Sequence, residues 1–391
     1  MKVTLSTIVV TVCNALSFIQ AIQEVPCVNT VDKYEYTITI PGISQKEFKD
    51  KARGCIIGAA LGDMLGAPTE FIPSRKAISK AYPPHGITGV ESLKEKDFKK
   101  DASGKKIAPY TDDTAMSILV LSKITRFSML HFDQPGKWNI NKVMQDLAFS
   151  FVQDMDNPYG WAQPSRAPGL TCLRNAKELS TRFALFSTKY YKDPHFWAIG
   201  KATEGGCGSV MRAHPFGLIF AGAIEQAIEW AVEHSKITHG APMALAACAA
   251  MACGVAYALR NEHPKVVAQK MYAAAKKYDA LTAQLIERAL EYASNTNKPS
   301  DEVFKEFQGW AAHEAIAAAT YAFLKHPDDL KKAIVLGVNT PGDSDSIASM
   351  AGALVGARVG AQQIPHEWLD VLEDSQRLIQ LADNVVNLYK R

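Results

Sequence analysis

Two short acidic clusters stand far apart in this chain, and their residue types are those of a cation site. The first is Thr111-Asp112-Asp113-Thr114 and the second is Asp343-Ser344-Asp345-Ser346. Carboxylates this dense repel one another, so bringing the clusters together costs several kcal/mol unless cations offset the charge. Aspartate carboxylates with threonine and serine hydroxyls form an all-oxygen ligand set, which suits Mg²⁺ or Mn²⁺ rather than zinc or copper. We therefore predict one metal site that is split between two parts of the chain.

The composition bounds the class of protein. With 391 residues and 47% hydrophobic residues, the chain can bury a large core. Forty-three Lys and Arg oppose forty Asp and Glu, and this balance is too even to indicate nucleic acid or a membrane surface as a partner. The seven cysteines are odd in number and form no C-x-x-C pair. We therefore predict neither a disulfide framework nor a zinc knuckle.

The N-terminal residues form a segment of a different kind. Residues 1–22 are apolar but interrupted by Thr, Asn and Gln, which fits a removable export or targeting segment and equally a short buried strand or helix. A membrane-spanning helix needs roughly 20 mostly apolar residues, so we expect no stable membrane insertion. Residues 23–45 form a lead-in, in which alternation over 34–40 predicts one strand. The protein would be secreted or translocated if residues 1–22 are a signal, and cytoplasmic otherwise.

Each acidic cluster directly precedes a segment with helical spacing of small and apolar residues, and such segments dominate from residue 46 onward. We predict a single all-α domain over 46–391, with almost no strand. The predicted helices cover 46–67, 113–130, 140–154, 169–186, 223–235, 242–260, 264–277, 281–294, 301–324, 328–338, 345–360 and 366–389. Two long connections, 72–110 and 155–210, interrupt them, and loops of this length are commonly functional.

Small residues recur every four positions in two of these helices. They are Gly58, Gly62 and Gly66 in the first helix, and Ala348, Gly352, Gly356 and Gly360 in the second. Residues four apart line one helix face, so each helix presents a smooth ridge. We hypothesise that the ridges face each other, which would bring Asp63 and the second acidic cluster into one site. The alternative is that each ridge packs on some other helix.

Four ordered motifs, which together span about residues 50–370, resemble the ADP-ribosylglycohydrolase family. They are Gly-Cys-Ile-Ile-Gly-Ala-Ala-Leu-Gly-Asp-Met-Leu-Gly-Ala-Pro-Thr-Glu-Phe at 54–71, Thr-Asp-Asp-Thr-Ala-Met-Ser at 111–117, Gly-Cys-Gly-Ser-Val-Met-Arg at 206–212 and Gly-Asp-Ser-Asp-Ser-Ile at 342–347. The resemblance implies an all-α fold that binds two divalent ions, Mg²⁺ first and Mn²⁺ second, between loops of these two acidic types.

By motif position, the resemblance also implies which side chains form the metal centre. The metal ligands would be Thr111, Asp112, Asp113, Asp343, Asp345 and Ser346. The catalytic acids would be Glu70, Asp112, Asp113 and Asp345, with Glu70 ordering the substrate or the attacking water. Asp63 lies inside a predicted helix, and we expect it to hydrogen-bond a metal-bound water or a loop backbone. The alternatives are helix N-caps for the two clusters and a solvated surface position for Glu70.

A glycine-rich turn is the expected binding loop for a diphosphate. Backbone N–H groups around Gly206 and Gly208 can approach an anion, and Ser209 adds a hydroxyl. In the family, the corresponding loop contacts the diphosphate of ADP-ribose. Arg212 would either reinforce this contact or form an internal salt bridge.

Two further positions resemble parts of the family's ligand cleft. His239, in a Thr-His pair, would lie near the adenosine, although a buried core histidine is the alternative. Gly169 ends an Arg-Ala-Pro-Gly sequence at 166–169 that resembles a cleft-lining loop.

The resemblance implies a glycosidic-bond hydrolase that removes ADP-ribose from modified protein side chains, by water attack at the anomeric carbon of the ribose. Its partners would be ADP-ribose and an ADP-ribosylated protein, with no nucleic acid, and the protein would act as a monomer. Arginine-linked ADP-ribose is expected first, because the motifs look closest to arginine-directed members. The alternatives are serine-linked or small-molecule ADP-ribose derivatives and a non-catalytic ADP-ribose-binding protein. Pro341 departs from the family pattern, in which a Gly often precedes the Asp-x-Asp element, and is expected to stiffen this loop.

Overall fold

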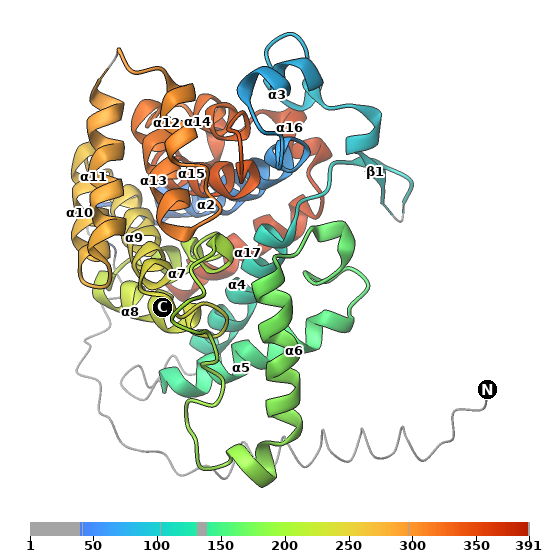
Figure 1. Cartoon of the computed structure of the whole chain (residues 1–391), viewed down its shortest axis with the longest axis vertical. Helices are drawn as coiled ribbons and strands as arrows, with labels where there is room; N and C mark the ends of the chain where they lie inside the picture. Colours follow the sequence, from blue (N-terminus) through green and yellow to red (C-terminus); the bar gives the residue numbers. More distant parts are fainter. Residues whose placement is uncertain (1–39, 41, 102, 131–138, 296, 390–391) are drawn as a thin grey trace.

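A pair of helices, α2 (Gln45–Gly66) and α15 (Ser344–Val359), forms the centre of the fold, and each is buried along nearly its whole length. The computed structural model describes residues 40, 42–101, 103–130, 139–295 and 297–389. In Figure 1, helices α9 to α13 stand on one side of this pair, and α4, α5 and α6 lie on the other. The predicted all-α class is therefore confirmed.

The described residues form the following further elements. The α-helices are α3 (Arg75–Ala81), α4 (Asp112–Leu130), α5 (Ile140–Gln153), α6 (Leu170–Ala184), α7 (His214–Ile219), α8 (Ile224–Ser235), α9 (Pro242–Leu259), α10 (Pro264–Lys276), α11 (Ala280–Ser294), α12 (Ser300–Glu306), α13 (Ala312–Lys325), α14 (Leu330–Val338), α16 (His366–Val371) and α17 (Ser375–Leu388). One small antiparallel hairpin joins β1 (Lys99–Lys100) to β2 (Lys106–Ile107), with Lys99 opposite Ile107. Short 3₁₀ turns include η1 (Ala67–Thr69), η6 (Pro164–Arg166) and η8 (Cys207–Ser209).

The glycine ridges of α2 and α15 face each other, as hypothesised. A Cβ atom on Gly62 would collide with the backbone carbonyl of Ala348, and one on Gly58 with the carbonyl of Gly352. The fit is reciprocal, because a Cβ atom on Gly356 would collide with the carbonyl of Gly54. A glycine costs about 1 kcal/mol relative to alanine inside a helix, so this row of glycines is explained by the close approach of two backbones.

Local signals fix where these two helices begin and end. The Ser44 hydroxyl accepts a hydrogen bond from the Glu47 N–H at 3.2 Å and caps α2. After Gly66, the chain tightens into η1 at Pro68, which has no N–H to continue the helix. Helix α15 ends at Gly360, whose φ of 84° is readily adopted only by glycine. The start of α15 and the end of α2 therefore meet at the second acidic cluster.

Helix α9 is the Ala-rich helix expected between residues 242 and 260. Among the described residues, it is the one helix long and apolar enough to cross a membrane, and most of it is buried inside the protein. It packs against α8 and α10 and also touches α15. Its apolar surface is thus used by the core.

Two long helices predicted from the sequence are each broken in the structure. The helix predicted over 301–324 divides into α12 and α13, because Gly309 takes a φ of 91°. The helix predicted over 366–389 divides into α16 and α17 around Glu373 and Asp374, and Asp374 has a φ of 54°. Both breaks supply backbone or side chains to the site region, and helical periodicity alone does not reveal them. The short helices α3 and α7 lie in segments where no helix was predicted.

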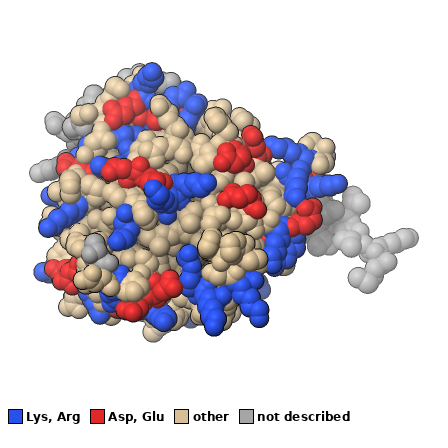
Figure 2. Space-filling view, turned by 90° about the horizontal axis from the view of Figure 1, so that it is seen from above, with Lys and Arg blue, Asp and Glu red and all other residues tan. Residues whose placement is uncertain are grey.

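Charged groups of both signs share the surface. Figure 2 shows Lys and Arg side chains interspersed with Asp and Glu over the face in view, in line with the small formal charge of +3. The segment 1–22 and positions 34–39 of the predicted strand lie outside the described residues.

The close contact of α2 and α15 leads to a first prediction. Replacing Gly62 with Leu should lower the free energy of unfolding by about 3 kcal/mol, because the side chain must push two backbones apart. The same displacement should weaken Mg²⁺ binding, measured by calorimetry on the folded fraction. Ala273→Leu on the exposed face of α10 is the matched control. A Gly62→Leu protein that is as stable as the control and binds Mg²⁺ normally would contradict the assignment.

Candidate active site

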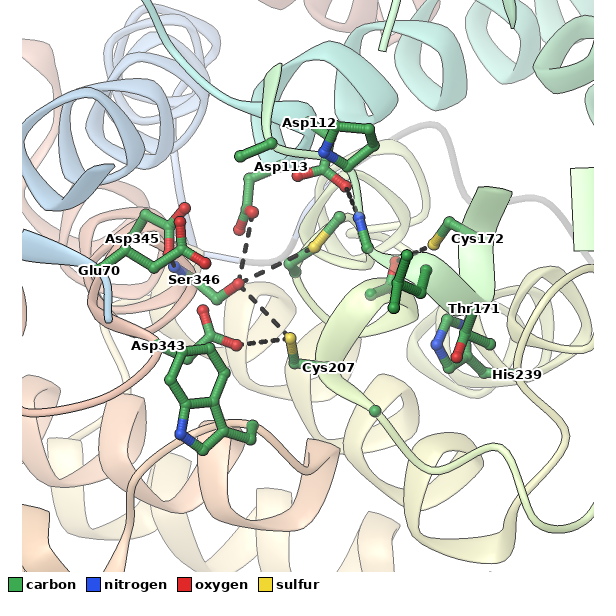
Figure 3. Close-up of a pocket in the computed structure, with 18 of the residues that line it drawn as sticks. Glu70, Asp112, Asp113, Thr171, Cys172, Cys207, His239, Asp343, Asp345 and Ser346 are labelled. Atoms are coloured by element: carbon green, nitrogen blue, oxygen red, sulfur yellow. Dashed lines mark hydrogen bonds between the residues drawn. The ribbon is translucent and has the colours of Figure 1, made fainter. Parts of the chain in front are cut away.

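Both acidic clusters face one cavity of about 390 Å³, which opens near the junction of α2, α4 and α15. Its wall includes Glu70, Asp112, Asp113, Asp343, Asp345 and Ser346. Figure 3 shows Glu70, Asp343 and Asp345 at one side of this cavity, with Thr171 and His239 at the other. Residues more than 200 positions apart in the sequence therefore meet at one site, as the split metal site requires.

The first cluster sits at the start of α4 and is held there by Asp63. The fully buried Asp63 carboxylate accepts hydrogen bonds from the backbone N–H groups of Thr111 and Thr114, each at 2.9 Å, and from the Thr114 hydroxyl at 2.6 Å. This is one of the two roles expected for Asp63, a bond to a loop backbone. Thr111 itself is buried and does not line the cavity. Its hydroxyl lies 3.4 Å from Asp113 Oδ2.

The second cluster sits at the start of α15. The Asp343 N–H donates to the carbonyl of Gln308 at 2.9 Å, which ties this loop to the break between α12 and α13. Ser346 joins the two clusters, because its hydroxyl donates to Asp113 Oδ2 at 3.3 Å. Ser344 turns away and donates to the Gly66 carbonyl at 3.0 Å. Asp343, Asp345 and Ser346 thus line the cavity, while Ser344 fastens the loop to α2.

Glu70 extends from the end of η1 toward the second cluster. Oxygen atoms of Glu70, Asp343 and Asp345 lie within 4.8 Å of one another. The preceding Thr69 anchors this turn, since its buried hydroxyl donates to the carbonyl of Val338 at 2.5 Å. Glu70 is only partly buried and lines the cavity, so it is not the solvated surface residue of the alternative interpretation.

These carboxyl groups raise one another's pKa. Burial, and then the charge of Asp345, raises the pKa of Glu70 to about 10 and that of Asp63 to about 6. The same two causes place the pKa values of Asp112, Asp113 and Asp343 well above the ordinary aspartate range. Without a compensating charge, the cluster therefore favours protonated carboxyls, which is the electrostatic cost inferred from the sequence.

The donor set fits divalent cations. Asp113 Oδ1 is buried and has no hydrogen-bond partner among the described residues, and a buried carboxylate oxygen without a partner is costly. A cation in contact with this oxygen removes that cost. Carboxylate and hydroxyl oxygens line this end of the cavity, which is the ligand type that Mg²⁺ and Mn²⁺ prefer. The acidic cluster can therefore bind a hard divalent metal.

The glycine-rich turn lies beside the second acidic cluster. Gly206 and Gly208 line the cavity, as does Cys207, whose thiol donates to Asp343 Oδ2 at 2.7 Å. The turn is fastened to the loop before α13, because the Cys207 N–H donates to the carbonyl of Trp310 at 3.3 Å. Gly169 also lines the cavity, and its N–H donates to Asp112 Oδ2 at 3.3 Å. The two glycine-containing segments thus border the carboxylates directly.

Ser209 and Arg212 differ from their expected placement as ligand contacts. Both are fully buried and neither lines the cavity. The Ser209 hydroxyl accepts from Ser235 at 2.9 Å, while Arg212 donates to the carbonyl of Gly208 and to the hydroxyl of Thr238, each at 2.7 Å. Ser209 ends η8 and Arg212 lies in the turn that follows, and both side chains support the glycine-rich turn from behind. Arg212 therefore uses its donors internally, on a carbonyl and a hydroxyl and not in the internal salt bridge given as its second expected role.

His239 lines the cavity although it is almost fully buried. Its Nδ1 lies 2.8 Å from the Thr238 hydroxyl. Burial, and then the positive charge of Arg212, lowers the pKa of His239 to about 3, so the ring is neutral at physiological pH. A neutral ring on the wall of a cleft can contact a nucleoside without adding charge.

Three residues of this region were missed in the sequence. Glu373 pairs with the buried Arg166 through two hydrogen bonds of 2.6 and 3.1 Å, which fixes the loop before Gly169. Phe71 and Trp310 both line the cavity. Phe71 directly follows Glu70, a position that could have marked it, whereas Trp310 and Glu373 lie in helix breaks that helical periodicity does not show.

Comparisons with known proteins identify the family of this chain. The family model for ADP-ribosylglycohydrolases matches residues 44–391, so the chain belongs to the ADP-ribosylglycohydrolase family. Family members hydrolyse glycosidic bonds.

Individual relatives extend the match over most of the chain. ADP-ribosylhydrolase ARH3 of Mus musculus is 26% identical and covers 86% of this chain and 91% of its own length. ADP-ribosylarginine hydrolase Tri1 of Serratia proteamaculans is 24% identical and covers 88% and 81%. A solved ADP-ribosylglycohydrolase-related protein complex matches with a TM-score of 0.61 and 22% identity, over 88% of this chain and 99% of that one. This last likeness supports the fold.

The raised pKa values lead to a prediction on stability. A carboxyl group with a higher pKa in the folded state binds more protons there than in the unfolded chain, so the folded state loses stability as pH rises above about 4. In EDTA, the melting temperature should therefore fall as pH rises through about 6, where Asp63 titrates, and continue to fall toward about 10, where Glu70 titrates. Added Mg²⁺ should raise the melting temperature more at high pH than at low pH. A Mg²⁺ effect that shrinks with rising pH would contradict the carboxylate site.

Asp63 gives a second prediction at this site. Asp63→Asn should lower Mg²⁺ affinity roughly 10- to 100-fold, the loss typical when a group that orients metal ligands is changed. The amide nitrogen of Asn cannot accept the hydrogen bonds that Asp63 Oδ2 receives from Thr114. Calorimetry with Mg²⁺ measures the change, and the exposed Asp301→Asn on α12 is the control. Equal Mg²⁺ affinity in the two variants would show that Asp63 does not position the ligands.

Proposed function

We propose that this protein removes ADP-ribose from arginine side chains of modified proteins in a reaction that depends on divalent cations. The observation that carries the proposal is the convergence of five carboxyl groups and Ser346 at one end of a cleft, with the glycine turn beside them and a neutral histidine at the far side. The carboxylate end suits cations and ribose hydroxyls, the glycine turn suits a diphosphate, and the far side suits a nucleoside. ADP-ribose has these parts in this order.

The metal ligands would be Asp112, Asp113, Asp343, Asp345 and Ser346, with Thr111 behind them at the loop. Bound divalent cations would supply positive charge for the ribose hydroxyls and for a water molecule, and would lower the pKa of that water. Cation binding would also drive the coordinating carboxyls to their ionised form, because a nearby positive charge favours it.

The remaining residues would bind and orient the substrate. Backbone N–H groups at Gly206 and Gly208 would face the diphosphate, while Arg212 and Ser209 hold this turn from behind. His239 would contact the adenosine side. Gly169 and Asp112 are hydrogen-bonded to each other, so the loop held by Arg166 and Glu373 would set the width of the cleft beside the ribose.

The proposed hydrolysis would need water as its only co-reactant. The bond between C1 of the ribose and the leaving nitrogen breaks, the water oxygen bonds to C1, and the leaving nitrogen takes up a proton from water. Glu70 is the proposed group for moving this proton, because it is the partly exposed carboxyl in the cavity and has a pKa raised by burial. Because its pKa is raised, Glu70 keeps its proton at neutral pH and could donate it to the leaving nitrogen.

Arginine-linked ADP-ribose is the proposed substrate among the family's alternatives. The sequence motifs look closest to arginine-directed members, and one matched relative is named an ADP-ribosylarginine hydrolase. Another is an ADP-ribosylhydrolase named ARH3, so a serine-linked substrate is the comparison in the test.

The test measures ADP-ribose release from arginine-modified and serine-modified peptides, in Mg²⁺ and in EDTA. We expect release from the arginine-linked peptide in Mg²⁺, and loss of activity in EDTA. Asp112→Ala and Asp345→Ala should each reduce kcat at least 100-fold, since each removes a proposed ligand. Release from the serine-linked peptide alone would overturn the linkage, and no release from either would overturn the function. Circular dichroism of both variants confirms that they are folded.

A further inference from the structure

Two aromatic side chains stand exposed at the carboxylate end of the cleft. Phe71 is 70% exposed and Trp310 is 40% exposed, and both line the cavity. Their rings are stacked, with centroids 5.1 Å apart and planes 19° from parallel. Large aromatic groups are ordinarily buried, so an exposed pair that borders a cleft indicates a contact surface for a ligand.

Phe71 is held on the loop that carries Glu70, and Trp310 is held in the break between α12 and α13, beside the glycine-rich turn. Phe71 follows Glu70, and its N–H donates to the carbonyl of Gly342, next to Asp343, at 3.3 Å. Its φ of 65° is rare for a bulky residue, and such strain persists where the surroundings enforce it, commonly at functional sites. The carbonyl of Trp310 accepts from the Cys207 N–H at 3.3 Å. The pair is therefore built into the site.

The position of the rings indicates which part of a substrate they meet. In Figure 3, Glu70, Asp343 and Asp345 lie at the opposite side of the cavity from Thr171 and His239. If the ribose carbon that reacts faces the carboxylates, the diphosphate and adenosine extend toward His239. The group that leaves from this carbon then projects at the carboxylate end, where Phe71 and Trp310 stand.

We propose that Phe71 and Trp310 bind the leaving side chain and select the planar guanidinium group of arginine. This inference rests on the proposed function and names the residues that set its substrate class. A guanidinium stacks on aromatic faces and is attracted by their negative potential. A serine side chain offers neither a planar face nor a positive charge, so the same pair gives it little binding energy.

Measurements of binding affinity can distinguish this role of Phe71 and Trp310 from an effect on the rate of hydrolysis. In a Glu70→Gln background, which should suppress hydrolysis, calorimetry would measure the affinity for an arginine-ADP-ribosylated peptide, a serine-ADP-ribosylated peptide and free ADP-ribose in Mg²⁺. We expect Trp310→Ala to weaken binding of the arginine-linked peptide about tenfold, as removal of a partly desolvated cation–π contact does. Phe71→Ala should act in the same direction. Affinities for the serine-linked peptide and for free ADP-ribose should stay within twofold.

The controls keep the result interpretable. Trp310→Phe retains an aromatic face and should keep most of the affinity, and Tyr159→Ala removes an 80% exposed ring outside the cavity and should change nothing. An equal loss for the arginine-linked peptide and free ADP-ribose would overturn the proposal, because the rings would then hold the ADP-ribose itself. No loss for any ligand would overturn it too. A wild-type protein that binds the arginine-linked peptide through this pair without releasing ADP-ribose would refute the proposed function and leave this inference standing.

Discussion

The contact between the backbones of α2 and α15 is the constraint on which the site depends. Glycines at every fourth position leave no side chains between the two helices, so carbonyl groups of one helix touch the Cα atoms of the other. The end of α2 therefore reaches the start of α15, where Gly66 packs against Asp345. Asp63 lies in the last turn of α2 and Glu70 follows shortly after this helix. The contact between the helices therefore brings both residues close to the second acidic cluster. A helix pair separated by ordinary side chains, with axes 8–10 Å apart, would leave these carboxyls too far apart to share cations.

The price of this arrangement is electrostatic. The carboxyl groups are buried together, and burial and mutual repulsion raise their pKa values. The fold holds them in place with hydrogen bonds that do not neutralise them, chiefly those from Thr111 and Thr114 to Asp63 and from Ser346 to Asp113. A polar cluster that lowers the stability of the folded protein, yet is tightly fixed, is what a preformed cation site requires. Stability and function are thus linked through the same groups.

Most of the helices and the acidic centre could be predicted from the sequence. The site residues that lie at breaks between helices could not. The spacing of glycines and the density of Asp residues are local signals, so the α2–α15 pairing and the two clusters could be predicted. Ser209 and Arg212 could not be placed correctly, because the direction of a side chain after a glycine turn depends on how the following residues coil. Trp310 and Glu373 lie where positive φ angles at Gly309 and Asp374 divide what helical periodicity indicates as continuous helices. Tertiary contacts fix such breaks, and a single sequence shows no trace of these contacts.

The acidic centre and its rim, by which we mean Phe71 and Trp310, would contribute differently to specificity. In the proposed binding mode, the carboxylates, Ser346 and the glycine turn would face groups that every ADP-ribose derivative shares, namely the ribose and the diphosphate. Contacts that are equal for two substrates cannot distinguish them, since discrimination depends on the difference between two affinities. The leaving group is the part in which such substrates differ, and in the proposed binding mode it would meet the protein beside Glu70, at the edge of the site formed by Phe71 and Trp310. Residues of the rim, which belong to helix breaks and turns, can therefore vary between related proteins without disturbing the cation site. Under this proposal, substrate choice in this protein would depend on Phe71 and Trp310 more than on the acidic clusters.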